Sequence, residues 1–152
     1  MAAFFFDSSA LAKNYIAETG TAWVQSIIAL PVNRIFVARI TLVELVSAIT
    51  RRTRSGNLTS SAATQALADV RTDFKDLYEI IAINRRLIRH AEQAAEKHGL
   101  RAYDAVQLAA AQQVNQAYIS RGLPSVPFIC ADNQLNIAAT VEGLSIDDPN
   151  SH

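Results

Sequence analysis

The chain has 152 residues, of which 50% are hydrophobic and 18% are charged, so we expect one globular domain and exclude a disordered chain. Its 14 basic and 14 acidic residues cancel, so any nucleic-acid binding has to use a local patch. The N-terminus MAAFFFDSS lacks the basic region of a signal peptide, and no apolar run reaches the roughly 18 residues of a membrane span. We therefore expect a soluble, cytoplasmic protein.

The first half of the chain contains two short apolar runs, AFFF and IFVA, each followed by helical segments. In the stretch TLVELVSAITRRTRSG, apolar residues recur at helical spacing, and Gly56 at its end is a typical helix stop. The elements expected here are a strand at 3–6, helices at 8–18 and 21–30, a strand at 35–38, and helices at 41–55 and 60–77.

The second half repeats this alternation, beginning with the run YEIIAI, which has β-branched strand character. The elements expected here are a strand at 78–83, a helix at 84–98, a helix through Asp104 that ends near Gly122, a strand at 127–131, a helix at 133–143 and a strand at 144–146. Apolar strands separated by helices predict an α/β domain whose parallel sheet is covered on both faces.

Four acids stand at the starts of predicted helices. Asp104 lies in the apolar run LRAYDAVQLAAA, where an unpaired carboxylate is costly to bury. Asp7 and Asp132 directly follow the first and fourth strands, and Glu44 lies in the first turn of its helix. Each also has a purely structural interpretation: Asp7 and Asp132 as N-caps, Thr41-x-x-Glu44 as a capping box, and Asp104 as a response to the helix dipole.

Two features together favour a shared site for these acids. Asp7 and Asp132 end strands at the carboxyl edge, where such sheets bind ligands, and residues such as Val43 and Ala102 that flank the other two acids should be buried. Two carboxylates about 4 Å apart repel by roughly 4 kcal/mol at an effective dielectric near 20, more than the 0.3–1 kcal/mol that a helix terminus typically returns. Oxygen ligands of this kind suit Mg²⁺ or Mn²⁺.

Four stretches in this order, DSSALAKNY after a strand, TLVELVSAI, LRAYDAVQLAAA and ADNQLNIAATVEGL followed by a prolyl tail, resemble the PIN-domain nucleases. In particular the chain resembles the VapC-type ribonuclease toxins of toxin–antitoxin modules. The resemblance runs from about residue 3 to residue 149. It implies a single PIN-like domain over residues 1–149, with a five-stranded parallel sheet and helices on both faces, and a short tail over residues 150–152.

The resemblance also implies an activity and a site. It predicts an endoribonuclease that hydrolyses RNA phosphodiester bonds with Mg²⁺ or Mn²⁺ and that has Asp7, Glu44, Asp104 and Asp132 as its catalytic acids. The three aspartates would be the main metal ligands, Glu44 would assist or position a water, and Ser9 would support Asp7.

Further implications concern partners. The resemblance implies a homodimer and a small VapB-like antitoxin, whose C-terminal segment would cover the acidic cleft and introduce a basic side chain among the acids. A noncatalytic PIN-like domain that binds RNA or a protein is the alternative interpretation. Intact acids argue against this alternative without excluding it.

One position departs from the pattern of the family. The family often has Thr or Ser two residues before the last acid, where this chain has Cys130, its only cysteine. This leaves open whether a hydrogen bond beside Asp132 is kept. The apolar stretch PFICAD predicts that Cys130 is a small buried core residue.

Cations near the acidic motifs could contact the phosphate backbone of RNA. The run RRTRSG is equally typical of a basic, solvated helix C-terminus, which the helix dipole favours. The candidate RNA-binding residues are Lys13, Arg39, Arg51, Arg52, Arg54 and Arg101.

Overall fold

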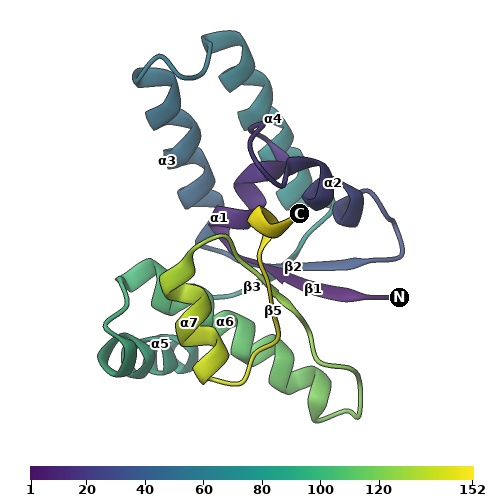
Figure 1. Ribbon diagram of the computed structural model, residues 1–152, viewed down its shortest axis with the longest axis vertical. Helices are drawn as coiled ribbons and strands as arrows, with labels where there is room; N and C mark the ends of the chain where they lie inside the picture. Colours follow the sequence, from purple (N-terminus) through teal and green to yellow (C-terminus); the bar gives the residue numbers. More distant parts are fainter.

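Five short apolar runs form one sheet in the computed structural model, which describes residues 1–152 (Figure 1). All four strand pairings are parallel, and the strand order is β3-β2-β1-β4-β5. The predicted α/β class with five parallel strands is therefore confirmed. The strands are β1 (Ala3–Phe6), β2 (Arg34–Ala38), β3 (Glu79–Ile81), β4 (Phe128–Ile129) and β5 (Ile146–Asp147).

Helices cover both faces of the sheet, as expected (Figure 1). Helices α1 to α4 lie on one face, where α3 and α4 form a hairpin that projects beyond the sheet, and α5 to α7 lie on the other. None of the helices is both long and apolar enough to span a membrane. The helices are α1 (Ser8–Leu11), α2 (Thr21–Ile28), α3 (Thr41–Arg54), α4 (Ser60–Asp76), α5 (Arg85–His98), α6 (Ala102–Ile119) and α7 (Asn133–Val141), with 3₁₀ turns η1 (Ala12–Asn14) and η2 (Pro149–Ser151).

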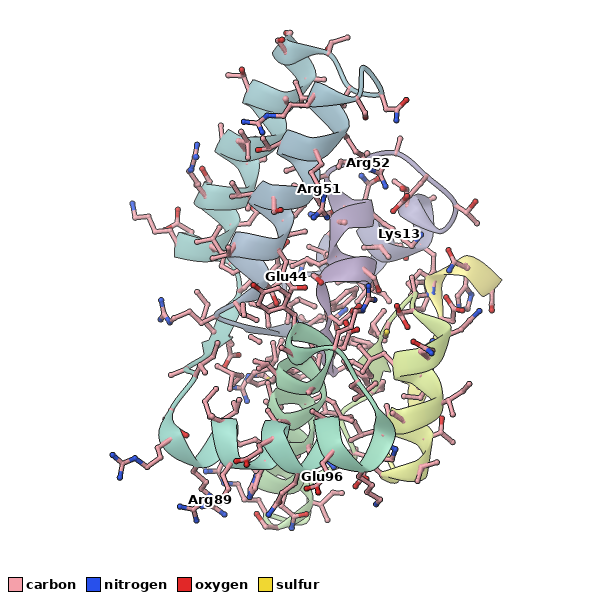
Figure 2. All side chains as sticks on the ribbon, turned by 90° about the vertical axis from the view of Figure 1, so that its left-hand side faces the viewer. Lys13, Glu44, Arg51, Arg52, Arg89 and Glu96 are labelled. Carbon is pink, nitrogen blue, oxygen red and sulfur yellow. The ribbon has the colours of Figure 1, made fainter.

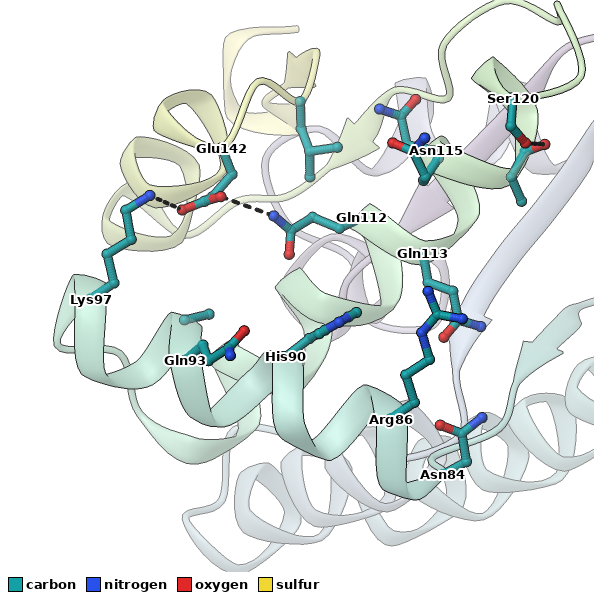
Figure 3. Close-up of a pocket in the computed structure, with 14 residues that line it drawn as sticks. Asn84, Arg86, His90, Gln93, Lys97, Gln112, Gln113, Asn115, Ser120 and Glu142 are labelled. Carbon is teal, nitrogen blue, oxygen red and sulfur yellow. Dashed lines mark hydrogen bonds and ion pairs between the residues drawn. The ribbon is translucent and has the colours of Figure 1, made fainter.

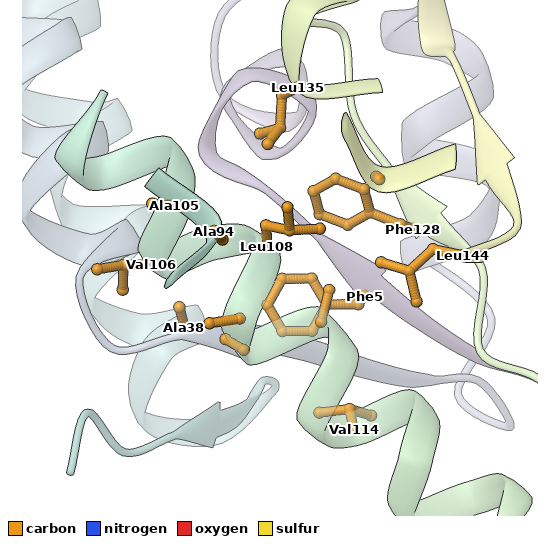
Figure 4. Packing of buried hydrophobic residues seen from close by; sticks show 14 of the residues in the cluster. Phe5, Ala38, Ala94, Ala105, Val106, Leu108, Val114, Phe128, Leu135 and Leu144 are labelled. Atoms are coloured by element: carbon orange, nitrogen blue, oxygen red, sulfur yellow. The ribbon is translucent and has the colours of Figure 1, made fainter. Parts of the chain in front are cut away.

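The sheet divides the core into two hydrophobic clusters. Successive side chains of a strand point to opposite faces, so Phe5 and Phe6 of β1 enter different clusters, and both are fully buried. Phe5 packs in the cluster of Leu108 and Phe128 on the side of α5 to α7 (Figure 4). Full burial of one such phenylalanine side chain typically stabilises the fold by about 1.5–3 kcal/mol. Burial on both faces explains why the run AFFF is apolar throughout and does not alternate.

The helix predicted at 8–18 is too long. α1 ends at Leu11 and tightens into η1, after which the chain turns toward α2. The turn is fixed by side chains: Lys13 Nζ donates to Thr19 O at 2.8 Å, and Tyr15 OH donates to Asp73 Oδ2 at 2.7 Å. Gly20 then adopts a φ of +84° before α2, and an added Cβ there would lie 2.2 Å from the carbonyl oxygen of Pro149.

The last strand begins two residues later than the start of the predicted strand at 144–146. Leu144 N–H donates to Ala139 O at 3.0 Å, which closes the end of α7, and the buried Leu144 side chain packs under the sheet. The chain after β5 packs on the domain, since the His152 ring stacks on Trp23 with 4.1 Å between ring centroids.

The sheet has one switch point. From β1 the chain continues to β2 and β3 on one side, and it later returns to β4 and β5 on the other side of β1. Crevices at the carboxyl ends of strands beside such a reversal are the usual ligand sites of open α/β sheets. The residues that follow β1 and β4 therefore border the expected position of a site.

Candidate active site

Asp7 and Asp132 follow neighbouring strands, and each caps the helix that comes next. Asp7 Oδ1 accepts the Ala10 N–H at 3.0 Å, and Asp132 Oδ1 accepts the Leu135 N–H at 2.9 Å. The N-cap interpretation is thus correct for both residues. It uses one oxygen of each carboxylate and leaves Oδ2 of each outside the cap, so capping and a functional role are compatible.

Ser9 connects the ends of β1 and β4. Its Oγ donates to Asp7 Oδ1 at 2.8 Å and accepts the Ala131 N–H at 2.9 Å. This geometry fits the supporting role expected for Ser9. The same hydroxyl ties the chain just before Asp132 to the chain just after Asp7, and so fixes the relative position of two acids.

Cys130 is fully buried, as predicted from its apolar setting. Its Sγ accepts the Asp132 N–H at 3.4 Å and lies 3.8 Å from Ser9 Oγ. A sulfur contact therefore stands where a hydroxyl is common in the family. Burial, with a smaller contribution from the nearby Asp7 carboxyl, raises the pKa of the Cys130 thiol well above its usual range, so the group is an inert thiol.

Glu44 turns inward from the first turn of α3. The capping-box interpretation is wrong, because the N-cap of α3 is Ile40 and no side chain caps this helix. Instead Glu44 Oε2 accepts from Ser8 Oγ at 2.8 Å, and Glu44 Oε1 accepts from Gln107 Nε2 at 2.8 Å. These bonds link Glu44 to the start of α1, beside Asp7, and to α6, which carries Asp104.

Asp104 and Asp132 share one counter-charge. Arg101 Nε donates to Asp104 Oδ2 at 3.0 Å, and Arg101 Nη2 donates to Asp132 Oδ2 at 3.4 Å. A single guanidinium can contact both carboxylates only if they face the same space. The start of α6 and the end of β4 therefore bring these two acids together.

The remaining link is between Asp7 and Glu44. Burial raises the pKa of Asp7 to about 7, against the hydrogen bonds from Ala10 and Ser9 that lower it, and the nearby Glu44 charge adds to the rise. The structure thus gathers all four predicted acids at the switch point of the sheet. Asp7 is the most buried of the four, and its burial disfavours the charged form of the carboxyl.

The four acids offer only oxygen ligands to a divalent cation. No three His, Cys, Asp or Glu side chains lie close enough, as they stand, to ligate one ion together. The donors are nevertheless all carboxylate oxygens, and Mg²⁺ typically keeps several waters and takes only one or two carboxylates. The Arg101 guanidinium already places a positive charge between Asp104 and Asp132. The residues fit a hydrated cation that would take the place of this guanidinium.

Lys13 differs from what was expected of an RNA-binding cation. Its side chain is only 4% exposed, and its Nζ donates to Thr19 O and to Asn150 Oδ1, at 2.8 and 2.9 Å. Contact with a phosphate would require breaking both bonds. The structure therefore gives Lys13 a structural role, in which it joins η1 to the C-terminal turn η2.

The candidate arginines fall into two groups. Arg52 pairs with Glu18 at 3.0 Å, and Arg101 is held by the two acids described above. Three others, Arg39, Arg51 and Arg54, are exposed and form no ion pair. Figure 2 shows Arg51 on the side of Glu44 that leads toward the tip of α3. These three side chains are free to meet a phosphate.

The apolar residues that flank Glu44 and Asp104 are buried in part. The expected burial is confirmed for Leu45, Ala105, Val106 and Leu108. It is wrong for Val43 and Ala102, because α3 and α6 turn the acids inward and these neighbours outward. Val43 is 66% exposed, and Tyr103, beside Asp104, is 59% exposed. The acidic site thus has exposed apolar side chains at its rim.

Ser8 and Gln107 were not singled out from the sequence. Gln107 stands one helical turn after Asp104 in the same apolar run. A buried amide needs partners just as a buried carboxylate does, so the reasoning applied to Asp104 could have identified it. Ser8 gave no comparable signal, because its partner Glu44 lies far away in the sequence.

One hollow of the molecule lies away from the acids. A cavity of about 790 Å³ opens between α5, the second half of α6 and the end of α7 (Figure 3). Its lining is rich in amides, and Glu142 within it is paired with Lys97 at 2.7 Å and with Gln112 at 3.1 Å. None of the four acids lines this cavity.

Among solved structures, several proteins share this fold at low sequence identity. FitAcB from Neisseria gonorrhoeae has a TM-score of 0.66 at 15% identity, with 96% of this chain and 97% of that chain covered. VapC20 from Mycobacterium tuberculosis, described as a toxin that cleaves the sarcin-ricin loop, has a TM-score of 0.63 at 16% identity, with coverage of 89% and 94%. A toxin–antitoxin complex from Klebsiella pneumoniae has a TM-score of 0.60 at 17% identity, with coverage of 96% and 97%.

No curated protein matches the sequence. The sequence model of the PIN domain, in contrast, matches residues 4–123, which include Asp7, Glu44 and Asp104. Asp132 lies beyond the matched range, and its assignment to the site depends on the geometry around Ser9 and Arg101. Because the match spans most of the chain and the fold agrees with it, this protein belongs to the PIN domain family.

Proposed function

We propose that this protein is a Mg²⁺- or Mn²⁺-dependent endoribonuclease, and that it is the toxin of a type II toxin–antitoxin module in the cytoplasm. The observation that carries the proposal is the gathering of Asp7, Glu44, Asp104 and Asp132 at the switch point of the sheet. Four acids from four separate segments converge there, although their mutual repulsion opposes folding.

The proposed reaction adds water across one P–O bond of an RNA phosphodiester, and it needs no side-chain nucleophile. When bound, the cation would acidify that water and neutralise charge on the phosphate. Asp7, Asp104 and Asp132 would hold the cation, directly or through its waters, with the oxygens that do not cap helices. Glu44 would position the water, because each of its oxygens has a lone pair left beyond the bonds from Ser8 and Gln107.

Exposed arginines support RNA as the substrate. Arg51 lies on the same face of α3 as Glu44, two helical turns or about 10 Å further along the axis. Arg39 and Arg54 are likewise exposed. We propose that these side chains contact phosphates on either side of the cleaved bond. The name of the VapC20 neighbour, a toxin that cleaves an RNA loop, also favours RNA.

Exposed apolar side chains at the rim of the site support binding of a protein partner. Val43 and Tyr103 expose apolar surface directly beside Glu44 and Asp104, and such surface is typical of interaction sites. We propose that a VapB-like antitoxin covers the acids, with a basic side chain in the place now taken by Arg101, and that the free protein is a homodimer. A toxin–antitoxin complex among the structural neighbours supports the antitoxin partner.

The decisive experiment is cleavage of a structured RNA by the purified protein with Mn²⁺ or Mg²⁺, compared with the Asp7→Asn variant. Asn keeps the Oδ1 that accepts from Ala10 and Ser9, so the variant is expected to fold, which circular dichroism checks. We expect cleavage by the wild type and none by the variant. If the wild type cleaves the RNA no faster than the variant, the enzyme proposal is wrong, and the noncatalytic, RNA- or protein-binding alternative takes its place.

A further inference from the structure

Gln107 is the only fully buried amide beside the acidic site. Its side chain is 0% exposed and lies in α6 among Val106, Leu108 and the alanines of the core. Its Nε2 donates to Thr41 Oγ1 at 2.7 Å and to Glu44 Oε1 at 2.8 Å. Both protons of the amide are thus directed at the first turn of α3.

The other end of this amide is unfavourable for stability. Gln107 Oε1 is buried and accepts no hydrogen bond. A buried polar atom without a partner lowers stability, whereas an apolar side chain of similar size would pack among the same neighbours without this penalty. Gln107 is therefore poorly explained as a residue of the hydrophobic core, and an explanation has to come from what its Nε2 holds.

What Nε2 holds is the orientation of Glu44. A free glutamate side chain has several rotamers, and fixing it in one of them costs conformational entropy. Ser8 binds Oε2 from one side and Gln107 binds Oε1 from the other, so the carboxylate is fixed between the end of β1 and α6. Ser8 is only partly buried, whereas Gln107 is enclosed and cannot easily leave.

We infer that Gln107 is a positioning residue of the site: it holds the Glu44 carboxylate in the orientation that the proposed hydrolysis needs. The inference rests on the proposed function. Gln107 touches neither substrate nor cation and acts through Glu44 alone. Its bond to Thr41 keeps the amide turned toward α3, so that the orphaned oxygen faces the core and the donor faces the acid.

The test uses a pair of matched variants. Thr41→Val removes only the hydroxyl partner of the amide. Thr41→Val with Gln107→Leu removes the whole polar pair together with the orphaned Oε1, and it leaves the half-buried Glu44 Oε1 without its donor. We expect the double variant to be at least as stable to heat as Thr41→Val alone. We also expect its kcat for RNA cleavage to fall by about 100-fold, the typical effect of misplacing a catalytic group by about 1 Å, with KM unchanged.

A double-mutant cycle separates positioning from a general structural effect. In a Glu44→Gln background, removal of Thr41 and Gln107 should not lower the residual rate further, because the group that Gln107 positions is already lost. If the loss of kcat caused by the double variant is the same in the Glu44→Gln background as in the wild type, the inference is overturned. Mn²⁺ affinity of the double variant, measured by calorimetry, should stay within about threefold of the wild type, since the aspartates are untouched. A much larger loss would make Gln107 part of the cation site.

The outcomes of these experiments distinguish failure of the Gln107 inference from failure of the proposed ribonuclease function. A wild type that cleaves RNA, together with a double variant that keeps its kcat, overturns the inference alone. A wild type that cleaves no RNA with Mn²⁺ or Mg²⁺ overturns both. A double variant that unfolds at a clearly lower temperature than Thr41→Val contradicts the view that Gln107 is unfavourable for stability.

Discussion

The two halves of the acidic site relieve the same repulsion in different ways. In the inner half, Asp7 is buried and Glu44 is half-buried, and hydrogen bonds from Ser8, Ser9 and Gln107 hold the two carboxylates. In the outer half, Asp104 and Asp132 are half-buried and face the side chain of Arg101, which is 76% exposed. Burial raises the pKa of Asp7 in the inner half to about 7, and below that pH the retained proton removes the repulsion between Asp7 and Glu44. The outer half relieves repulsion by an exposed cationic side chain.

This difference indicates a division of labour within one site. The inner half is built in advance by hydrogen bonds between distant segments, so its geometry is fixed at some expense of stability. The outer half is held only by exposed ion pairs, which contribute little and rearrange easily. Asp104 and Asp132 would hold a cation in the place of the Arg101 guanidinium, and the charge of that cation would favour the deprotonated form of Asp7. The predictions below test each part of this comparison.

The largest effect is expected from loss of the outer acids. Asp104→Ala or Asp132→Ala should abolish nuclease activity, by at least about a thousandfold in kcat/KM, because several kcal/mol of charge stabilisation by the cation is lost. The fold should remain, as judged by circular dichroism. Thermal scans supply the control: Mn²⁺ should raise the unfolding temperature of the wild type and raise that of either variant much less. An equal rise in all three proteins would contradict cation binding by these acids.

A second prediction concerns pH and the inner half. The unfolded chain loses the Asp7 proton near the usual pKa of 3.8, whereas the folded protein keeps it until about pH 7. Between these values folding is coupled to proton uptake, so the free energy of unfolding of the metal-free protein should fall as pH rises from about 4 to 7. The Asp7 contribution lost over this window is about 4 kcal/mol.

Urea unfolding in the presence of a chelator, at several pH values, measures this loss. The Asp7→Asn variant is the matched control, because it keeps the capping oxygen but has no proton to lose. Its stability should depend less steeply on pH, so the gap between variant and wild type should widen in favour of the variant toward pH 7. Parallel curves for the two proteins would show that Asp7 is not the titrating group.

Ser9 allows a smaller test of the junction between the halves. Ser9→Ala removes the donor to Asp7 and leaves the Ala131 N–H without its acceptor, so we expect a loss of roughly 1–3 kcal/mol in the free energy of unfolding. Ser26→Ala is a suitable control, because the Ser26 hydroxyl is exposed and donates only to Trp23 O within its own helix. Urea unfolding at one pH compares the two. A Ser9 variant as stable as the Ser26 variant would contradict the bridging role.

The parallel sheet and the placement of Asp7 at the end of its first strand were predictable because they depend on local pattern. The apolar run of β1 is followed at once by Asp7, and parallel strands bring such positions to one edge of the sheet. The bonds that orient the acids were not predictable in the same way. Glu44 meets Ser8 and Gln107 across separations of 36 and 63 residues, which no local pattern encodes.

Lys13 shows that nearness in the sequence can also suggest a contact that the structure does not make. In the sequence it stands close to Asp7, and proximity suggested a contact with RNA. In the structure α1 ends at Leu11, and the tighter turn of η1 directs Lys13 into a buried contact with Asn150. An unforeseen change from α-helix to 3₁₀ turn thus altered the role of a residue without altering the fold.

The smallest expected effect is that of Arg101, and it is the most direct measure of how mobile the outer half is. If its guanidinium occupies the place of a cation, Arg101→Gln should raise Mn²⁺ affinity a few-fold, because the competing charge is gone. The effect stays modest because the side chain is exposed and screened by solvent. Arg39→Gln is the matched control, since Arg39 is also exposed but pairs with no acid. Calorimetric titration with Mn²⁺ at low and at high salt compares the two. Lower affinity in the Arg101 variant would mean that the guanidinium organises the two aspartates for the cation and does not compete with it, and the outer half would then be built in advance like the inner one.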